Sequence, residues 1–269
     1  MIDCGSLEYA HARLLARHGQ RPDEAAWRRL ETLREIAPLL DVARSTGLRP
    51  FLVGIGAETP VHQVEATLRG HWRALVQEVA AWMPAAWQPS IAWCAVWPDL
   101  AWLQHLARGA EPAPWMLDDA LWRDLAAAPA PGRAAELSAG PWGALALAWP
   151  VPHALAQAWR DEWLRRLPKA GGDDGDDGNT AGSPASDTLA QLVRTLNEHG
   201  HAFAQAHPSQ GWLQRSALRT RLTLLLRRAT LDPAAAFIYL ALCALDLERL
   251  RAQLLPRLLF RQAAQPRAA

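Results

Sequence analysis

The chain contains 269 residues, of which 50% are hydrophobic and 20% are charged, and its 28 basic residues nearly balance 27 acidic ones. At roughly 100 to 200 residues per domain, this length predicts one large domain or two small ones, with a core that needs no disulfide support. The charge balance argues against global disorder and against a nucleic-acid partner.

The N-terminus has no apolar core segment and carries Asp3 and Glu8 within its first ten residues. We therefore expect no secretory signal. Three cysteines, Cys4, Cys94 and Cys243, share no short spacing, which argues against a disulfide framework and a paired-cysteine zinc site. Together these features predict a cytoplasmic protein.

Helical periodicity dominates the sequence. Residues 23–42 form one predicted helix, with Trp27 and Ile36 inward and an interruption or bend at Pro38. Residues 51–55 are the only short, β-branched apolar run, and nearby glycines favour a loop or a stray extended segment there. The predicted fold class is therefore all-α, a multi-helix bundle.

The clearest predicted helix covers residues 61–82, started by the Thr59–Pro60 pair and closed by Pro84. Its apolar positions recur at steps of three and four: Val61, Val64, Leu68, Trp72, Leu75, Val79 and Trp82. Its other side carries Glu65, Arg69, Arg73 and Glu78. Further helices are predicted at residues 99–108, 117–127, 153–167, 188–203, 210–229 and 233–260.

Two uncharged stretches, residues 79–98 and 137–159, approach the length of about 20 apolar residues that a membrane helix needs. Each contains three prolines, which remove backbone donors and clash with the preceding turn. We expect loops between buried helices there and no membrane span.

Residues 169–187 are rich in glycine, aspartate, serine and threonine, which predicts an acidic linker or surface loop. A calcium loop is the alternative, but Gly175 or Gly178 would occupy a ligand position and no glutamate closes the loop. The segment separates a Trp-rich region, 1–168, from a basic C-terminal region, 188–269, unless both belong to one interrupted domain. The C-terminal region has 11 arginines against four acidic residues, and contact with the linker would offset this charge.

The standard catalytic and phosphate-binding motifs are missing from the sequence. The densest polar cluster contains Glu198, His199, His201 and His207, for which zinc ligation is one interpretation. His199 and His201 are two residues apart and point to different sides of a helix, which favours solvated histidines near a frayed helix end. We predict no catalytic residue, no cofactor and no metal site.

Tryptophan is unusually frequent, with 14 residues against two tyrosines and four phenylalanines. Exposed tryptophans would suit stacking on sugars or bases, or a lipid interface. Six of them fall instead at apolar positions of helical patterns: Trp27, Trp72, Trp82, Trp102, Trp122 and Trp163. We therefore favour a role in the core or at a protein interface.

The last predicted helix places Arg251 on an otherwise apolar face. A buried arginine needs an acidic partner, and Asp246 lies on a different face, so we expect the partner to come from another helix. The alternative is an arginine whose head group reaches solvent at the rim.

Four stretches, in order along the chain, resemble the C subunit of the archaeal and bacterial V/A-type ATPases, which is called the d subunit in the eukaryotic V-ATPase. Tyr9-Ala-His-Ala-Arg13 resembles the family's opening Tyr-x-x-Ala-Arg. Residues 64–68 resemble its Ile-Glu-x-x-Leu element, and Asp99 to Arg108 resembles an Asp-x-x-Asn-Leu helix that ends in a basic turn.

The last helix resembles the family's final helix, Pro-x-x-x-x-x-Tyr-Leu-x-x-Lys-Glu-x-Glu-Ile-x-Asn-Leu-Arg. The matching positions hold Pro233, Tyr239, Leu240, Asp246, Leu247, Leu250 and Arg251. Cys243 and Ala244 replace the family's Lys-Glu pair, and Trp102 and Arg249 replace its asparagines, so the polar contacts of those residues are not carried over.

The resemblance implies a funnel of three similar helical lobes on the cytoplasmic side of a membrane, without an active site of its own. Its partners would be the membrane rotor ring and the central shaft of a rotary ATPase, and its role would be torque transmission for ion transport. It implies structural or interface roles for the matched residues Arg13, Asp99, Arg108, Tyr239, Asp246 and Arg251.

Two other functions stay open. A helical adaptor or regulatory protein outside the rotary ATPases would share the composition and the helix content but not the ordered motifs. A small helical enzyme would need a Trp-lined pocket in which Asp99, Arg251 or the histidines near His199 converge.

Overall fold

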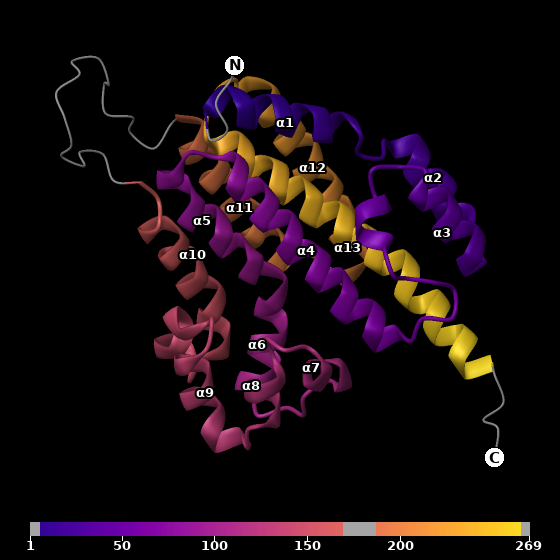
Figure 1. The fold of residues 1–269 in the computed structure, drawn as a ribbon, viewed down its shortest axis with the longest axis vertical. Helices are drawn as coiled ribbons and strands as arrows, with labels where there is room; N and C mark the ends of the chain where they lie inside the picture. Colours follow the sequence, from indigo (N-terminus) through magenta and orange to yellow (C-terminus); the bar gives the residue numbers. More distant parts are fainter. Residues whose placement is uncertain (1–5, 169–186, 265–269) are drawn as a thin grey trace. The chain divides into compact units, whose positions relative to one another are not determined.

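A computed structural model describes residues 6–168 and 187–264 of the chain. Every regular element in these two ranges is helical, which confirms the predicted all-α class (Figure 1). The α-helices are α1 (Leu7–Gly19), α2 (Glu24–Thr32), α3 (Ile36–Arg44), α4 (Val61–Trp82), α5 (Gln88–Trp93), α6 (Leu100–Ala107), α7 (Pro114–Asp118), α8 (Arg123–Ala127), α9 (Arg133–Ala139), α10 (Leu155–Arg165), α11 (Asp187–Gln205), α12 (Gly211–Arg228) and α13 (Ala234–Ala264).

Short 3-10 helices lie between several of these elements. They are η1 (Arg49–Leu52), η2 (Ala85–Trp87), η3 (Cys94–Asp99), η4 (Ala130–Gly132), η5 (Gly143–Ala148), η6 (Pro152–Ala154) and η7 (Pro208–Gln210). The predicted acidic segment, with its calcium alternative, lies outside the described residues except for Asp187.

The chain divides into two compact units that are not consecutive in sequence. Unit 1 takes residues 1–20, 78–91 and 167–249, and unit 2 takes residues 21–77, 92–166 and 250–269. Three of the five divisions fall inside α4, α5 and α13, so each of these helices contributes to both units. The division by composition into a Trp-rich region, 1–168, and a basic C-terminal region, 188–269, stays a prediction.

Unit 1 contains α1, α11, α12 and the first part of α13. Ser6 caps α1 by accepting a hydrogen bond of 3.2 Å from the backbone N–H of Tyr9, as expected of serine at a helix start. The helices α11 and α12 pack against each other and are joined by a short connection that includes η7, which makes them a helical hairpin.

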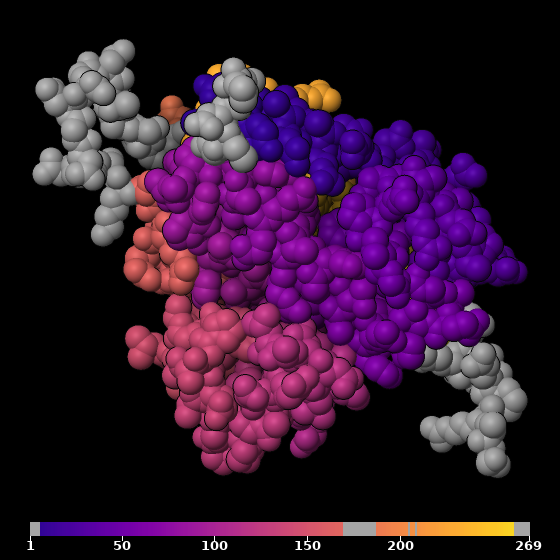
Figure 2. Space-filling view, in the orientation of Figure 1, coloured from indigo at the N-terminus to yellow at the C-terminus, as the bar shows by residue number. Residues whose placement is uncertain are grey.

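Unit 2 contains α2, α3 and α6 to α10, together with most of α4 and the end of α13. The segments from α6 to α9 gather in one body, coloured magenta to pink in Figure 2. A buried chain of tryptophan rings runs through it, with centroid separations of 5.4 Å between Trp115 and Trp122 and 4.5 Å between Trp122 and Trp142. Of the six tryptophans predicted at apolar positions, all are buried except the half-buried Trp102.

The helix predicted over residues 23–42 is two helices, and the prediction of a break at Pro38 is wrong. The chain leaves the helical conformation at Leu33, three residues before α3 begins. Pro38 lies in the first turn of α3, where a backbone N–H has no intrahelical acceptor, so the missing N–H of proline is tolerated there.

The helix predicted over residues 117–127 is also interrupted, between α7 and α8. Asp119 causes this break through its side chain, because its Oδ1 accepts a hydrogen bond of 2.9 Å from the N–H of Leu121. Such local bonds compete with helix continuation. The sequence analysis also missed α1, α5 and α9 as helices, whereas α4 and α6 match their predicted ranges within a residue.

Candidate functional site

Charged residues follow one side of α4 at intervals of four: Glu65, Arg69 and Arg73. The sequence placed them on the side of the helix opposite its apolar stripe. Glu65 and Arg69 are nevertheless only 6% and 7% exposed, so this side is buried as well. Burial of charge is costly without partners, which makes the surroundings of these side chains informative.

Each of the three charges has a partner from a different segment of unit 2. Arg251 of α13 donates from Nε to Oε1 of Glu65 at 2.6 Å. Arg69 donates from Nη1 to Oδ1 of Asp99 at 2.6 Å and to the carbonyl oxygen of Pro98 at 2.8 Å. Arg73 donates from Nη2 to Oδ2 of Asp119 at 2.6 Å. The row therefore contains three acidic and three basic side chains, and its formal charges cancel.

The Arg69–Asp99 pair is the most deeply buried of the three. Burial raises the pKa of Asp99 above its ordinary value, although the charges of Arg69 and Arg73 act in the opposite direction. Burial also lowers the pKa of Arg69, opposed mainly by Asp99 and then by Glu65. Each ionised group is therefore supported by its neighbours in the row, and loss of one charge would expose the others to the cost of desolvation.

The row also contacts the tryptophan chain. The guanidinium of Arg69 lies over the ring of Trp115, 4.8 Å from its centroid, which is a cation–π geometry. Within the described ranges, four buried donors near this contact have no hydrogen-bond acceptor: Arg69 Nε, Arg73 Nη1, Trp115 Nε1 and Trp122 Nε1. The hydrogen bonding of this cluster is therefore incomplete within the described part of the protein.

Two of the predicted site residues belong to this row. Asp99 bonds to Arg69 in the middle of the row, and Arg251 bonds to Glu65 at one end. The expectation that Arg251 pairs with an acidic residue of another helix is confirmed. Arg108 instead ends α6 as an exposed residue, where its backbone N–H contacts the carbonyls of Gln104 and His105.

The other three predicted residues belong to unit 1. Arg13 lies over the ring of Trp82 at 4.9 Å, while its neighbour Arg17 makes the shorter ion pair with Glu78, at 2.6 Å. Tyr239 and Asp246 are buried in α13. Asp246 accepts a hydrogen bond of 2.6 Å from Nη1 of Arg219 in α12.

The sequence analysis missed Arg69 and Arg73 as members of a site. Their spacing of four residues from Glu65 was the available signal, since it places all three side chains on one side of a helix. The spacing alone does not predict that Asp99 and Asp119, from other segments, lie against that side of α4.

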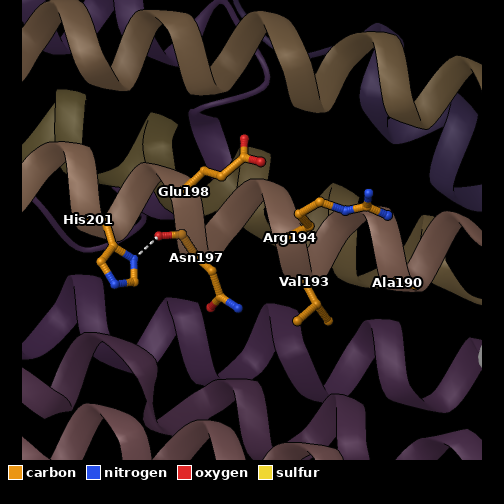
Figure 3. Close-up of a pocket in the computed structure, with 6 residues that line it drawn as sticks. All are labelled: Ala190, Val193, Arg194, Asn197, Glu198 and His201. Carbon is orange, nitrogen blue, oxygen red and sulfur yellow. Dashed lines mark hydrogen bonds between the residues drawn. The ribbon is translucent and has the colours of Figure 1, made fainter.

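The histidine cluster does not assemble into a metal site in the part of the chain that is described. His201 bonds through Nδ1 to the carbonyl of Asn197 at 2.8 Å, as Figure 3 shows, and His207 contacts Ser209. His199 packs near Phe203, and burial together with Arg215 lowers its pKa. Within the same residues, no helix combines the length and apolar character that crossing a bilayer requires.

No family model, curated protein or solved structure matches the chain.

Proposed function

We propose that this chain is a non-catalytic central-stalk subunit of a V/A-type rotary ATPase, which couples the central shaft to the membrane rotor ring and transmits torque for ion transport. The observation that carries the proposal is the ion pair between Glu65 and Arg251. Each residue belongs to a separate stretch that resembles the C/d family of central-stalk proteins, and the two are 186 positions apart. Three of the four resembling stretches meet in unit 2, whereas Tyr9–Arg13 belongs to unit 1.

A third stretch of the same resemblance joins them. Asp99 opens the stretch that resembles the family's middle helix, and it pairs with Arg69, one helical turn from Glu65 on α4. Three stretches that resemble one family thus supply neighbouring members of a single buried row. If the three stretches resembled the family only by chance, we would not expect their residues to share one set of contacts.

The row also suits a mechanical role. A part that transmits torque must resist shear between its helices, and the row ties α4 to α13, to the residue before α6 and to the residue after α7. Removing one member of a buried ion pair such as Arg69–Asp99 costs about 3–5 kcal/mol, so this tie is hard to open. The matched residues Asp99, Asp246 and Arg251 act in this account as internal struts.

Affinity purification of the chain from its native host in mild detergent tests the proposal. We expect the rotor-ring and central-shaft proteins of a rotary ATPase to co-purify in near-equal amounts with the chain. Recovery of the chain alone, or with unrelated soluble proteins, would overturn it.

A second candidate function is a helical adaptor outside the rotary ATPases. It is favoured by the exposed apolar side chains of unit 1, among them Leu213 and Leu224 on α12, which suit docking to any protein partner. The same purification separates the two, because an adaptor would recover a partner that belongs to no rotary ATPase.

A further inference from the structure

The α11–α12 hairpin of unit 1 carries a groove of ≈ 510 Å³ that the proposed function does not use. Arg194 and Glu198 line it from α11, and Arg221, Leu224 and Arg228 line it from α12. All five side chains are exposed. The groove is therefore open to solvent along both helices.

The charge of the hairpin is strongly positive. The two helices contain six arginines and two acidic residues, Asp187 and Glu198, both of which border the groove. Glu198 pairs with Arg221 at 3.3 Å, but the two side chains are 57% and 60% exposed, and such a pair contributes little. Asp187 occupies the first turn of α11, where the helix dipole already favours a carboxylate.

Other arginines of the hairpin are paired away from the groove. Arg215 bonds to Glu248 at 2.7 Å, and Arg219 bonds to Asp246 at 2.6 Å. Arg194 and Arg228, in contrast, make no ion pair with the acidic side chains that the structure describes. Two cations at the groove are therefore available to carboxylates from outside.

Apolar side chains also line the groove. Leu224 is 51% exposed on its wall, and Leu225, which lines it as well, is buried. A ligand that matches the groove must therefore present apolar side chains as well as negative charge. Binding is favoured when an apolar group of the ligand covers the exposed part of Leu224 and removes it from water.

The groove continues as a second hollow of ≈ 600 Å³ along α11. Figure 3 shows Arg194 and Glu198, which line both hollows, on one side of the helix, with Val193 and Asn197 on the other. Along α11, the lining of the first groove runs from Asp187 to Glu198, a length of about 16 Å at 1.5 Å per residue. This length matches about three turns of a docked helix.

We propose that this groove binds an acidic amphipathic helix of a partner protein, whose carboxylates pair with Arg194 and Arg228 and whose apolar side covers Leu224. The inference stands apart from the proposed function, because it rests on this hairpin alone. A protein segment fits better than a nucleic acid, because a helix can place carboxylates at Arg194 and Arg228 and neutral side chains near Asp187 and Glu198, whereas every nucleotide carries a phosphate. Helix-in-groove docking uses the combination of apolar anchors and flanking charges that the groove would recognise.

A designed probe tests the inference on the full-length chain. The probe is a fluorescein-labelled helical peptide of leucine, alanine and glutamate, about 14 residues long so that it spans the groove. Fluorescence anisotropy should show binding that weakens with salt. The R194Q/R228Q variant should bind roughly tenfold more weakly, because two ion pairs are lost. The matched control R227Q removes the neighbouring arginine of α12, which does not line the groove, and should leave binding within about twofold.

Four outcomes would overturn the proposal. The first is equal affinity for a peptide with glutamine in place of glutamate. The second is an equal loss of peptide affinity in R227Q and in R194Q/R228Q, once circular dichroism has verified that each variant is folded. The third is tighter binding of a single-stranded oligonucleotide through Arg194 and Arg228. The fourth is peptide binding that appears only after residues 171–186 are deleted, which would make this chain's own acidic segment the occupant.

Discussion

Glu65 and Arg251 are joined by a hydrogen bond of 2.6 Å between Nε and Oε1, although 186 positions separate them in the sequence. Glu65 is buried, whereas the side chain of Arg251 is 43% exposed. The arginine thus covers a carboxylate that would otherwise lie uncompensated inside unit 2. The contact ties the last helix of the chain to α4.

Loss of this contact should destabilise the protein measurably. We expect Arg251→Met to lower the free energy of unfolding by about 1–2 kcal/mol, less than for a fully buried pair because the arginine is partly solvated. A double-mutant cycle with Glu65→Gln, followed by urea unfolding, should give a coupling energy of about 1 kcal/mol. Arg194→Met, at an exposed arginine, is the control and should change the stability by less than about 0.5 kcal/mol. Additive effects of the two substitutions would show that the pair contributes nothing.

The Arg69–Asp99 pair predicts a larger effect with a characteristic rescue. Asp99→Ala should cost about 3–5 kcal/mol, because it leaves the buried guanidinium of Arg69 without its carboxylate. The double variant Arg69→Met with Asp99→Leu should recover much of that loss, since apolar residues often replace a buried ion pair at little cost. Thermal unfolding of the three proteins is the measurement. A double variant less stable than Asp99→Ala would contradict the account.

Trp72 and Trp122 form a matched pair for testing hydrogen bonding in the core. Both are fully buried, but Nε1 of Trp72 donates to the carbonyl of Cys94 at 3.2 Å, whereas Nε1 of Trp122 has no partner in the described ranges. Trp72→Phe should therefore cost about 1 kcal/mol more than Trp122→Phe, because it removes a buried hydrogen bond that Trp122 does not make. Chemical denaturation of both variants measures the two losses of unfolding free energy. Equal losses would show that the hydrogen bond of Trp72 does not contribute to stability.

His199 makes the stability of unit 1 sensitive to acid. Burial is the main cause of its lowered pKa, with Arg215 and Arg221 adding to the effect and Glu248 opposing it. The native state therefore binds fewer protons than the unfolded state near the ordinary histidine pKa, and stability falls as the pH decreases through that range. His199→Gln should flatten this part of the pH profile in urea unfolding measured between about pH 5 and 8. If the stability of His199→Gln depended on pH as steeply as that of the wild type, groups other than His199 would cause the dependence.

The sequence predicted those helices whose signals are local. The Thr59–Pro60 start, the apolar steps of three and four, and Pro84 together identified α4 within a residue. Pro38 misled the prediction because the sequence does not state whether a proline lies in the first turn or the middle of a helix. Asp119 ends α7 through a side-chain bond that competes with the helix, and its pairing with Arg73 depends on tertiary structure.

The candidate site was likewise predictable only where its signal in the sequence is local. Arg251 on an apolar face predicted either an acidic partner from another helix or a head group that reaches solvent, and the side chain both pairs with Glu65 and is 43% exposed. The identity of that partner as Glu65 depends on how α13 lies against α4 within unit 2, which no local pattern specifies. The burial of Arg69 has the same origin, because its side of α4 is polar in sequence and is covered only in the fold.

ATP-driven ion pumping by native membranes tests the central claim most directly. Membranes from a host that lacks this chain should keep ATP hydrolysis by the catalytic head but lose ion transport, and the wild-type chain should restore transport. Ion transport that persists at the wild-type rate without the chain would contradict the claim that it couples the shaft to the rotor ring.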